Sequence, residues 1–438
     1  MKSKVIASLA TPWGTGAIAL IRVSGDDSIQ IVNRLTSVDL EKLPANMQVY
    51  SKISNQNKFL DEVMISVFHQ PKSFTGENMV EISTHGGQLI SQEVLKAIID
   101  QGAILAPRGE FTRRAFLNKK VNLLQAEAIN DIINAKSEGA LNKFRETLNG
   151  NNTQVMNHLK EKLLNLLARI EVNLDYPEYE NYQFYQTEIQ PEIEAILMQV
   201  ENIIDNTQKI ISFRSGYRVV IIGKPNVGKS SLLNAILGKN KAIVTQIAGT
   251  TRDVVEGEIN FQGYTYIFYD TAGMHESQDI IELEGIHKTK EMINFADVIL
   301  LVLDGSEKLT KEDDELIKNY QDRALIITNK KDLGTKEKLN YWSLSTKNPQ
   351  DIQQLLWEIY QRTTKDNPRS SSEYLTNDRQ LKLMENVKQN LKEIPQPLTL
   401  DLLANKVSQS LKAIFEILGQ DFNEELLDYI FNNFCIGK

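Results

Sequence analysis

The chain has 438 residues, of which 41% are hydrophobic and 24% charged, as in ordinary soluble globular proteins of about two to four domains. Its formal net charge of −8 argues against a protein that coats nucleic acid through bulk positive charge, although local contacts with RNA are still possible. A single cysteine, Cys435, excludes internal disulfides and cysteine metal clusters, and no apolar run is long enough to predict a membrane span.

The amino-terminal residues, 1–118, have the pattern of a compact α+β domain. Short apolar stretches at 17–23 and 62–68 alternate with glycine-rich turns and predict strands, whereas the apolar spacing of 88–101 predicts a helix. We therefore expect a first domain that ends near residue 118.

Helical patterns surround a segment in which strands and helices alternate. In residues 119–212 and 372–438, apolar residues recur at helical spacing over long stretches with little glycine. Residues 213–371 have the pattern of a nucleotide-binding α/β domain. The simplest organisation is a helical domain interrupted by that α/β domain. We expect helices at 158–172, 191–210, 380–391, 399–418 and 424–433, and α/β strands at 218–222, 264–269, 297–303 and 324–328.

The segment from Gly223 to Ser230, with the sequence GKPNVGKS, has the spacing of a phosphate-binding loop. It lies between the predicted strand 218–222 and a helical pattern at 231–237, which is the strand–loop–helix context that such a loop requires. In this setting backbone N–H groups cradle phosphates, Lys229 reaches the β/γ oxygens and the Ser230 hydroxyl ligates Mg²⁺.

Three further motifs of a GTPase follow in order. Thr251 lies where a threonine closes on Mg²⁺ when the γ-phosphate is present, and Asp270-Thr271-Ala272-Gly273 ends a predicted strand with a carboxylate for the Mg²⁺ shell. In Asn329-Lys330-Lys331-Asp332, the Asp332 carboxylate matches the donor edge of guanine, which adenine lacks. The nucleotide is therefore predicted to be GTP. Ser343-Leu344-Ser345 is the expected last base-contacting loop, although Ser-Ala-Lys is usual there.

Two details differ from a Ras-like switch. Met274 stands where a Ras-like enzyme has its water-orienting glutamine, and a thioether cannot position water. Spacing alone does not choose a replacement among the acidic residues that follow. The second detail is Asn226, whose carbonyl oxygen could hold a monovalent cation beside the phosphates; a turn-forming role is the equal alternative. The acidic residues are Glu276, Asp279, Glu282 and Glu284.

Motifs outside the α/β domain resemble those of one family. The chain is similar, along its whole length, to the MnmE (TrmE) family of tRNA modification GTPases of bacteria and organelles. The motifs are Ser73-Phe74-Thr75-Gly76-Glu77-Asn78, Thr84-His85-Gly86-Gly87, Arg108-Gly109-Glu110-Phe111-Thr112-Arg113-Arg114, Gln125-Ala126-Glu127-Ala128 and Cys435-Ile436-Gly437-Lys438.

The resemblance implies a cytoplasmic homodimer with no membrane attachment. Each chain would have a tetrahydrofolate-binding-like α+β domain, a helical domain and an inserted Ras-like P-loop G domain. It also implies K⁺-stimulated GTP hydrolysis in a complex with the FAD protein MnmG (GidA). Together they would build aminomethyl-type groups (cmnm⁵ or nm⁵) at C5 of wobble uridine 34 of certain tRNAs, with a one-carbon unit from 5,10-methylene- or 5-formyl-tetrahydrofolate.

The resemblance further implies site residues, matched motif by motif. Glu282 would position the attacking water. Mg²⁺ would be held by Ser230 and Thr251. K⁺ would be held by Asn226, Thr245, Ile247 and Thr250, and folate by Arg22, Glu81, Lys120 and Lys438. The nucleotide-binding set is Asn226, Val227, Gly228, Lys229, Ser230, Ser231, Thr245, Gln246, Ile247, Ala248, Gly249, Thr250, Thr251, Asp270, Thr271, Ala272, Gly273, Asn329, Lys330, Asp332, Ser343, Leu344 and Ser345.

Two alternatives stay open on the sequence. Cys435 is either a reactive thiol near the reacting uridine or a small residue tucked beside the folate pocket. The whole chain could also be a non-enzymatic regulatory GTPase, such as an Era- or Der-like ribosome-assembly factor. Such proteins share the G motifs but lack the first 120 or so residues and the Cys-Ile-Gly-Lys end.

Overall fold

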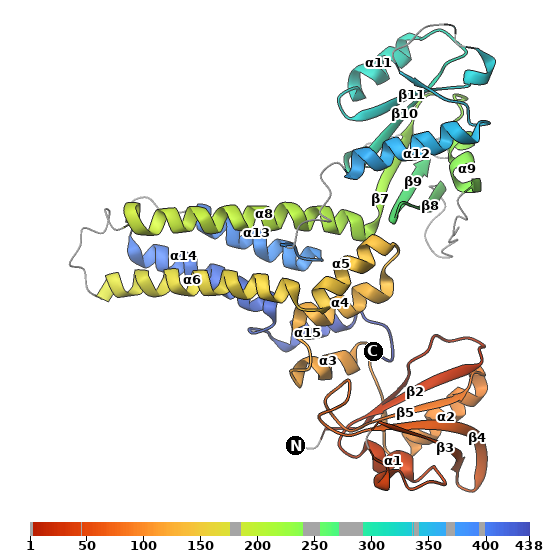
Figure 1. Ribbon diagram of the computed structural model, residues 1–438, viewed down its shortest axis with the longest axis vertical. Coiled ribbons are helices and arrows are strands. Elements are labelled where there is room, and N and C mark those ends of the chain that lie inside the picture. Colours follow the sequence, from red (N-terminus) through yellow and green to blue (C-terminus); the bar gives the residue numbers. More distant parts are fainter. Residues whose placement is uncertain are drawn as a thin grey trace, which may run out of the picture. The chain divides into compact units, whose positions relative to one another are not determined.

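The computed structural model describes residues 3–44, 46–175, 185–239, 255–270, 292–334, 336, 341–364, 373–393 and 399–438 (Figure 1). The chain divides into two units. One comprises Met1–Ile133, Arg145–Leu197 and Asn386–Lys438, and the other comprises Asn134–Phe144 and Met198–Glu385. Within the described residues, no helix is both long enough and apolar enough to cross a membrane.

The amino-terminal domain is built on a six-stranded sheet with the order β3-β4-β5-β2-β1-β6. All neighbours are antiparallel except β1 and β6, which are parallel. The expected strands correspond to β2 and β4 and the expected helix to α2, so the α+β prediction is confirmed. The elements are β1 (Ile6–Leu9), β2 (Ile18–Ser24), α1 (Ser28–Asn33), η1 (Leu40–Lys42), β3 (Met47–Asn55), β4 (Lys58–Phe68), β5 (Met79–His85), α2 (Gln88–Asp100) and β6 (Ile104–Leu105).

The core of this domain lies between one face of the sheet and α2. Alternate residues of β4, Val63, Ile65 and Val67, are buried, because side chains of a strand point to opposite faces in turn. Val94 and Ile98, one helical turn apart on α2, belong to the same core. Apolar residues therefore recur every second position along β4 and about every 3.6 positions along α2, as is required to bury one face of each element.

Long helices follow in the chain. Each of α6 and α14 has a buried apolar stripe, and the two helices pack against one another (Figure 1). In α6 the stripe includes Leu159, Leu163 and Leu166, and in α14 it includes Val407 and Ile414. The helical prediction is thus confirmed for both halves. The helices are α3 (Glu110–Leu117), α4 (Leu123–Asn134), α5 (Glu138–Leu148), α6 (Asn151–Asp175), η2 (Tyr185–Ile189), α8 (Gln190–Ser215), α13 (Asp378–Lys392), α14 (Leu400–Leu418) and α15 (Glu424–Phe431).

The carboxyl-terminal residues are bound to the amino-terminal part of the chain. The Phe111 N–H donates to the Lys438 carbonyl at 3.3 Å, and the Gly109 N–H donates to the Cys435 carbonyl at 3.5 Å. Gly437 has φ +85°, and a Cβ at this position would lie 2.4 Å from the Leu9 carbonyl oxygen. Only glycine therefore fits between this tail and β1 without displacement.

The α/β domain has a six-stranded sheet with the order β12-β11-β10-β7-β9-β8. Its strands are parallel except for β8, which pairs antiparallel with β9. The continuous apolar runs of β7 and β10 are buried, as expected for a sheet covered on both faces. The elements are β7 (Tyr217–Ile222), α9 (Lys229–Lys239), β8 (Val255–Phe261), β9 (Tyr264–Asp270), β10 (Val298–Asp304), α11 (Lys311–Tyr320), β11 (Ala324–Asn329), η4 (Lys331–Leu333), β12 (Trp342–Ser343) and α12 (Pro349–Thr364).

We predict that Gly437→Ala releases the carboxyl-terminal tail. The new methyl group would meet the backbone of Leu9 and Ala10, and alanine would also have to adopt a positive φ. Hydrogen exchange at the Gly109 and Phe111 amides should therefore become faster. Gly150→Ala is the matched control, because Gly150 has φ +94° and a Cβ there meets nothing within 4 Å. Equal exchange in the two variants would show that close packing of the tail does not depend on Gly437.

Candidate functional site

The loop between β7 and α9 depends on two glycines. Gly223 has φ +147°, and a Cβ there would lie 2.3 Å from the Val302 carbonyl oxygen. Gly228 has φ +100°, and its Cβ would lie 2.3 Å from Asn329 Nδ2. Asn226, at φ +66°, also lies in the left-handed region. The loop can therefore turn tightly against β10 and β11, as a phosphate-binding loop must.

Lys229, the first residue of α9, lies under this loop. Its Nζ donates to the carbonyl oxygens of Gly223 at 2.7 Å and Lys224 at 2.8 Å, and the residue is only 6% exposed. Burial lowers the pKa of Lys229, while the nearby Asp270 carboxylate opposes that shift. An ammonium held in this way can exchange carbonyl oxygens for the oxygens of a phosphate group.

A hydroxyl and a carboxylate converge beside the loop. Ser230 Oγ donates to Asp270 Oδ2 at 2.7 Å, and Asp270 is 2% exposed at the end of β9. Hard oxygen donors of these two kinds suit Mg²⁺, which favours few protein ligands together with water and phosphate oxygens. The residues present therefore fit this ion, with Ser230 as a direct ligand and Asp270 beside it.

The guanine motif lies next to the loop. Asn329, at the end of β11, is 1% exposed and its Nδ2 donates to the Val227 carbonyl at 3.0 Å. Asp332 accepts from Lys347 Nζ and from Ser345 Oγ, each at 2.8 Å. These two hydrogen bonds, that of Lys347 first, lower the pKa of Asp332. The carboxylate stays ionised and can accept two N–H groups from a guanine edge.

The loop after β12 contacts Asp332 through one residue more than the sequence prediction included. Of the three predicted residues, Ser343 lies on β12, Leu344 is fully buried and Ser345 reaches Asp332. Lys347 was missed, although it also contacts Asp332. The signal was present, because Ser345-Thr346-Lys347 matches the usual Ser-Ala-Lys pattern more closely than Ser343-Leu344-Ser345 does.

The segment from the end of β10 to the first turn of α11 contacts both halves of the site. Asp304 accepts from Lys330 Nζ at 2.6 Å, and Asp313 accepts from Lys224 Nζ at 2.6 Å. Burial by itself raises the pKa of both carboxyl groups. The hydrogen bonds that they accept together have the larger effect, so the pKa of Asp304 and of Asp313 is lowered. One lysine belongs to the phosphate loop and the other to the guanine motif, so this segment fixes the distance between the two.

A second group of charges lies in the amino-terminal domain and the tail. Arg22 and Glu81 are directly opposite on β2 and β5, and Arg22 Nε donates to Glu81 Oε1 at 2.7 Å. The Arg22 guanidinium lies 5.7 Å from the centre of the Phe74 ring, and Nη1 donates to the Gly437 carbonyl at 3.5 Å. Burial, followed by the charge of Arg22, lowers the pKa of Lys438. The structure thus brings together three of the four predicted folate residues.

The other predicted residues of this region are arranged differently. Lys120 Nζ donates to the Pro71 carbonyl at 3.0 Å, so its side chain reaches the loop that also carries Phe74. Cys435 is exposed, and its carbonyl is used by Gly109. The predicted residues outside the described part of the chain are Thr245, Gln246, Ile247, Ala248, Gly249, Thr250, Thr251, Thr271, Ala272, Gly273 and Glu282.

We predict that Lys224→Met weakens binding of GTP and GDP roughly tenfold. The substitution leaves Asp313, which is only 5% exposed, without its cationic partner at a cost of about 1–3 kcal/mol. Removing both charges in Lys224→Met/Asp313→Asn should restore part of the affinity. Titration calorimetry measures the nucleotide affinities of both variants. Lys311→Met is the control, because Lys311 is an exposed lysine on α11, the helix that carries Asp313. Equal affinities in Lys224→Met and Lys311→Met would show that the ion pair does not support the loop.

Comparisons with known proteins agree along the whole chain. The MnmE helical domain model matches residues 123–435, and the model for the amino terminus of the GTP-binding protein TrmE matches residues 5–120. The tRNA modification GTPase MnmE of Acholeplasma laidlawii is 41% identical over 448 residues and covers 100% of both chains. That of Streptococcus pyogenes serotype M4 is 39% identical, covering 99% of this chain and 98% of the relative.

A solved structure of Aquifex aeolicus Era bound to GDP and AlF₄⁻ is 31% identical, covers 41% of this chain and 57% of that chain, and has a TM-score of 0.22. The two family models and the full-length relatives are sufficient: this chain belongs to the MnmE (TrmE) family of tRNA modification GTPases.

Proposed function

We propose that this chain, a GTP hydrolase of tRNA modification, acts with the FAD protein MnmG to install aminomethyl-type groups at C5 of wobble uridine 34. The observation that carries the proposal is the presence in one chain of two separate polar sites. One surrounds Lys229 and Asp332, and the other joins Arg22, Glu81 and the tail. A purely regulatory GTPase of the Era or Der type would have no use for the second site. We further propose that the chain works in the cytoplasm as a homodimer.

In the nucleotide site the residues have separate tasks. Lys229 neutralises the β/γ phosphates, and backbone N–H groups of the Gly223–Gly228 loop bind their oxygens. Asp332 selects guanine through its two acceptor oxygens. Bound Mg²⁺, held by Ser230 and Thr251, would supply charge neutralisation of the phosphates. Thr251 lies outside the described residues.

The departing phosphoryl group needs stabilisation that this chain does not supply through a Ras-like glutamine. We propose K⁺ at Asn226, with Thr245, Ile247 and Thr250, and water positioning by Glu282; all of these except Asn226 lie outside the described residues. Asn226 lies within the Gly223–Ser230 loop and has a backbone in the left-handed region, at φ +66°. A carboxamide oxygen there is a suitable hard donor for a monovalent cation.

We predict that GTP hydrolysis is severalfold slower in NaCl than in KCl of the same concentration. Ionic strength is then identical in the two salts, so a difference in hydrolysis rate reflects the size and hydration of the cation. Asn226→Gly should abolish the difference, because glycine accepts the same positive φ but has no carboxamide. Initial rates of phosphate release at saturating GTP measure the effect. Equal wild-type rates in the two salts would rule out the K⁺ site.

The second site has the chemistry to bind a reduced folate. The Glu81 carboxylate can accept N–H groups of a pterin, and Arg22, Lys438 and Lys120 can bind anionic oxygens. These charges lie close together: the side chains of Arg22 and Glu81 are each about one-fifth exposed, and Arg22 also donates to the Gly437 carbonyl of the tail. We therefore propose that 5-formyl- or 5,10-methylene-tetrahydrofolate binds here and supplies the one-carbon unit. Cys435, exposed at the tail, is the nearby thiol to test by alkylation.

We predict that Arg22→Gln weakens 5-formyltetrahydrofolate binding at least tenfold and leaves GTP affinity unchanged. The loss of a guanidinium removes a charge-assisted hydrogen-bond donor from the folate site alone. Arg34→Gln, an exposed arginine of the same domain, is the matched control. Equilibrium fluorescence titration gives both affinities. Unchanged folate binding in Arg22→Gln would contradict the proposed site, whereas absence of folate binding by the wild-type chain would contradict the proposed one-carbon donor.

A further inference from the structure

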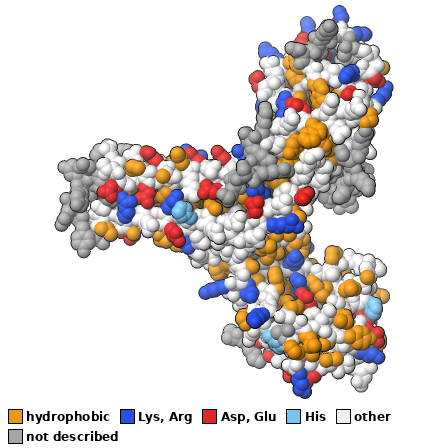
Figure 2. Space-filling model, viewed as in Figure 1, with side chains coloured by type: hydrophobic (Ala, Val, Ile, Leu, Met, Phe, Trp, Pro, Cys, Tyr) orange, Lys and Arg blue, Asp and Glu red, His pale blue; other side chains and the backbone are white. Residues whose placement is uncertain are grey.

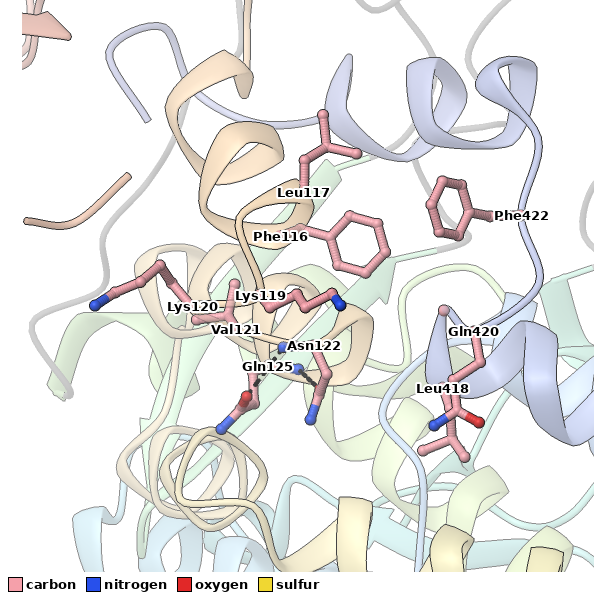
Figure 3. Close-up of a pocket in the computed structure, with 11 residues that line it drawn as sticks. Phe116, Leu117, Lys119, Lys120, Val121, Asn122, Gln125, Leu418, Gln420 and Phe422 are labelled. Carbon is pink, nitrogen blue, oxygen red and sulfur yellow. Dashed lines mark hydrogen bonds between the residues drawn. The ribbon is translucent and has the colours of Figure 1, made fainter. Parts of the chain in front are cut away.

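A cavity of about 590 Å³ lies between the loop that joins α3 to α4 and the loop that joins α14 to α15 (Figure 3). Its volume falls within the range of small-ligand sites. The residues that define its chemistry are Phe116, Lys119, Lys120, Gln420 and Phe422, and no Asp or Glu is among the described residues that line it. A cavity without carboxylates is notable in a chain with a net charge of −8.

The aromatic wall of the cavity is fixed from behind. Phe422 is 42% exposed, and its ring meets Phe116 edge to face with the ring centres 5.2 Å apart. Phe116 is 7% exposed and also contacts the ring of Phe431. A half-exposed ring held by buried neighbours offers apolar area for stacking with little further loss of side-chain freedom.

Lys119, which lines the cavity, and Lys160, which contacts the lining residue Gln420, supply two ammonium groups. Lys119 is exposed, and in Figure 3 it extends toward the space between Phe116 and Gln420, whereas Lys120 points away toward its bond with Pro71. Lys160, on α6, donates to Gln420 Oε1 at 3.3 Å. This contact leaves the amide nitrogen of Gln420 as a donor. The rim therefore presents positive charge and a neutral hydrogen-bond donor around an aromatic wall.

Other polar residues of the wall have a structural task. Asn122 and Gln125 cap the first turn of α4 by exchanging hydrogen bonds between side chain and backbone, at 2.9 and 3.1 Å. The side-chain amide nitrogens of Asn122 and Gln125 donate to Thr153 Oγ1 and to the Leu148 carbonyl. Recognition of a ligand would therefore fall to the lysines, Gln420 and the aromatic pair.

We propose that this cavity binds an unpaired nucleotide of the tRNA, with its base stacked on Phe422 and its phosphate near Lys119 and Lys160. The inference rests on the proposed function, which makes tRNA the substrate. Proteins recognise unpaired RNA by stacking bases on aromatic rings and by placing basic side chains along the backbone. Lys and Arg side chains are interspersed with Asp and Glu on the face shown in Figure 2, so attraction of RNA depends on local sites such as this one.

The first test is tRNA binding by the full-length chain, measured by fluorescence anisotropy with unmodified tRNA. Phe422→Ala should weaken binding about tenfold, the usual effect of losing one stacked base. Phe422→Trp should restore it, because indole stacks at least as well and keeps the contact with Phe116. Phe295→Ala removes a ring that is 67% exposed in the α/β domain and serves as the matched control. Circular dichroism confirms that each variant is folded.

The second test separates charge from stacking. Lys119→Asn fits the positive φ of 59° at this position and removes the ammonium. It should weaken tRNA binding and reduce the slope of log K against log salt by about one, whereas Phe422→Ala should leave that slope unchanged. Lys96→Asn, on the exposed side of α2, is the matched control.

The outcomes are distinguishable. If Phe422→Ala and Lys119→Asn bind tRNA as the wild-type chain does, the cavity is not a nucleotide site and the proposal is wrong. If these variants instead lose affinity for 5-formyltetrahydrofolate and keep that for tRNA, the cavity belongs to the folate site, and the proposal is equally wrong. A wild-type chain that binds no tRNA would contradict the proposed function together with this inference.

Discussion

The carboxyl-terminal tail is held against the first strand and the third helix of the same chain, and much of the architecture depends on that contact. The helical domain is assembled from two stretches that the α/β domain separates in sequence, and α6 and α14 pair across the gap. Hydrogen bonds from Gly109 and Phe111 then fix the last four residues, with Gly437 tight against Leu9. Because the tail is fixed, Lys438 and the Gly437 carbonyl meet Arg22, and a polar site forms from opposite ends of the chain.

The nucleotide site depends on two other features. The backbone conformation of its loop gives the site its shape, and ion pairs keep the loop in position. Glycines at 223 and 228 allow the loop to pass close to the backbone of β10 and to Asn329. Partly buried lysine–carboxylate pairs at Asp304, the end of β10, and Asp313, in the first turn of α11, then connect this loop to the guanine motif. Charged pairs removed in part from solvent contribute more to a single geometry than to net stability. A rigid spacing between phosphate and base recognition follows from that arrangement.

Most of the α/β fold could be predicted from the sequence, because glycine spacing and strand-ending Asp and Asn residues are local signals. The ends of β7, β9, β10 and β11 differ from expectation by at most one residue. Arg22 and Glu81 were predicted as site residues from the family resemblance alone. Only the register of β2 and β5 shows why the two residues lie opposite one another. Contacts between residues distant in sequence left no signal: the Lys224–Asp313 pair and the ring pair of Phe116 with Phe422 both depend on tertiary packing.

We propose that the GTPase site and the amino-terminal site serve one reaction on tRNA. Mass spectrometry of tRNA nucleosides tests it most directly, in cells that lack the chain and in cells complemented with wild type or with Lys229→Ala. We expect C5 aminomethyl-type uridines to vanish without the chain, to return with the wild type and to stay absent with Lys229→Ala, because this variant lacks the buried ammonium that would bind the phosphates. Unchanged wobble uridines in cells that lack the chain, accompanied by altered ribosome profiles, would contradict the account and favour a ribosome-assembly GTPase.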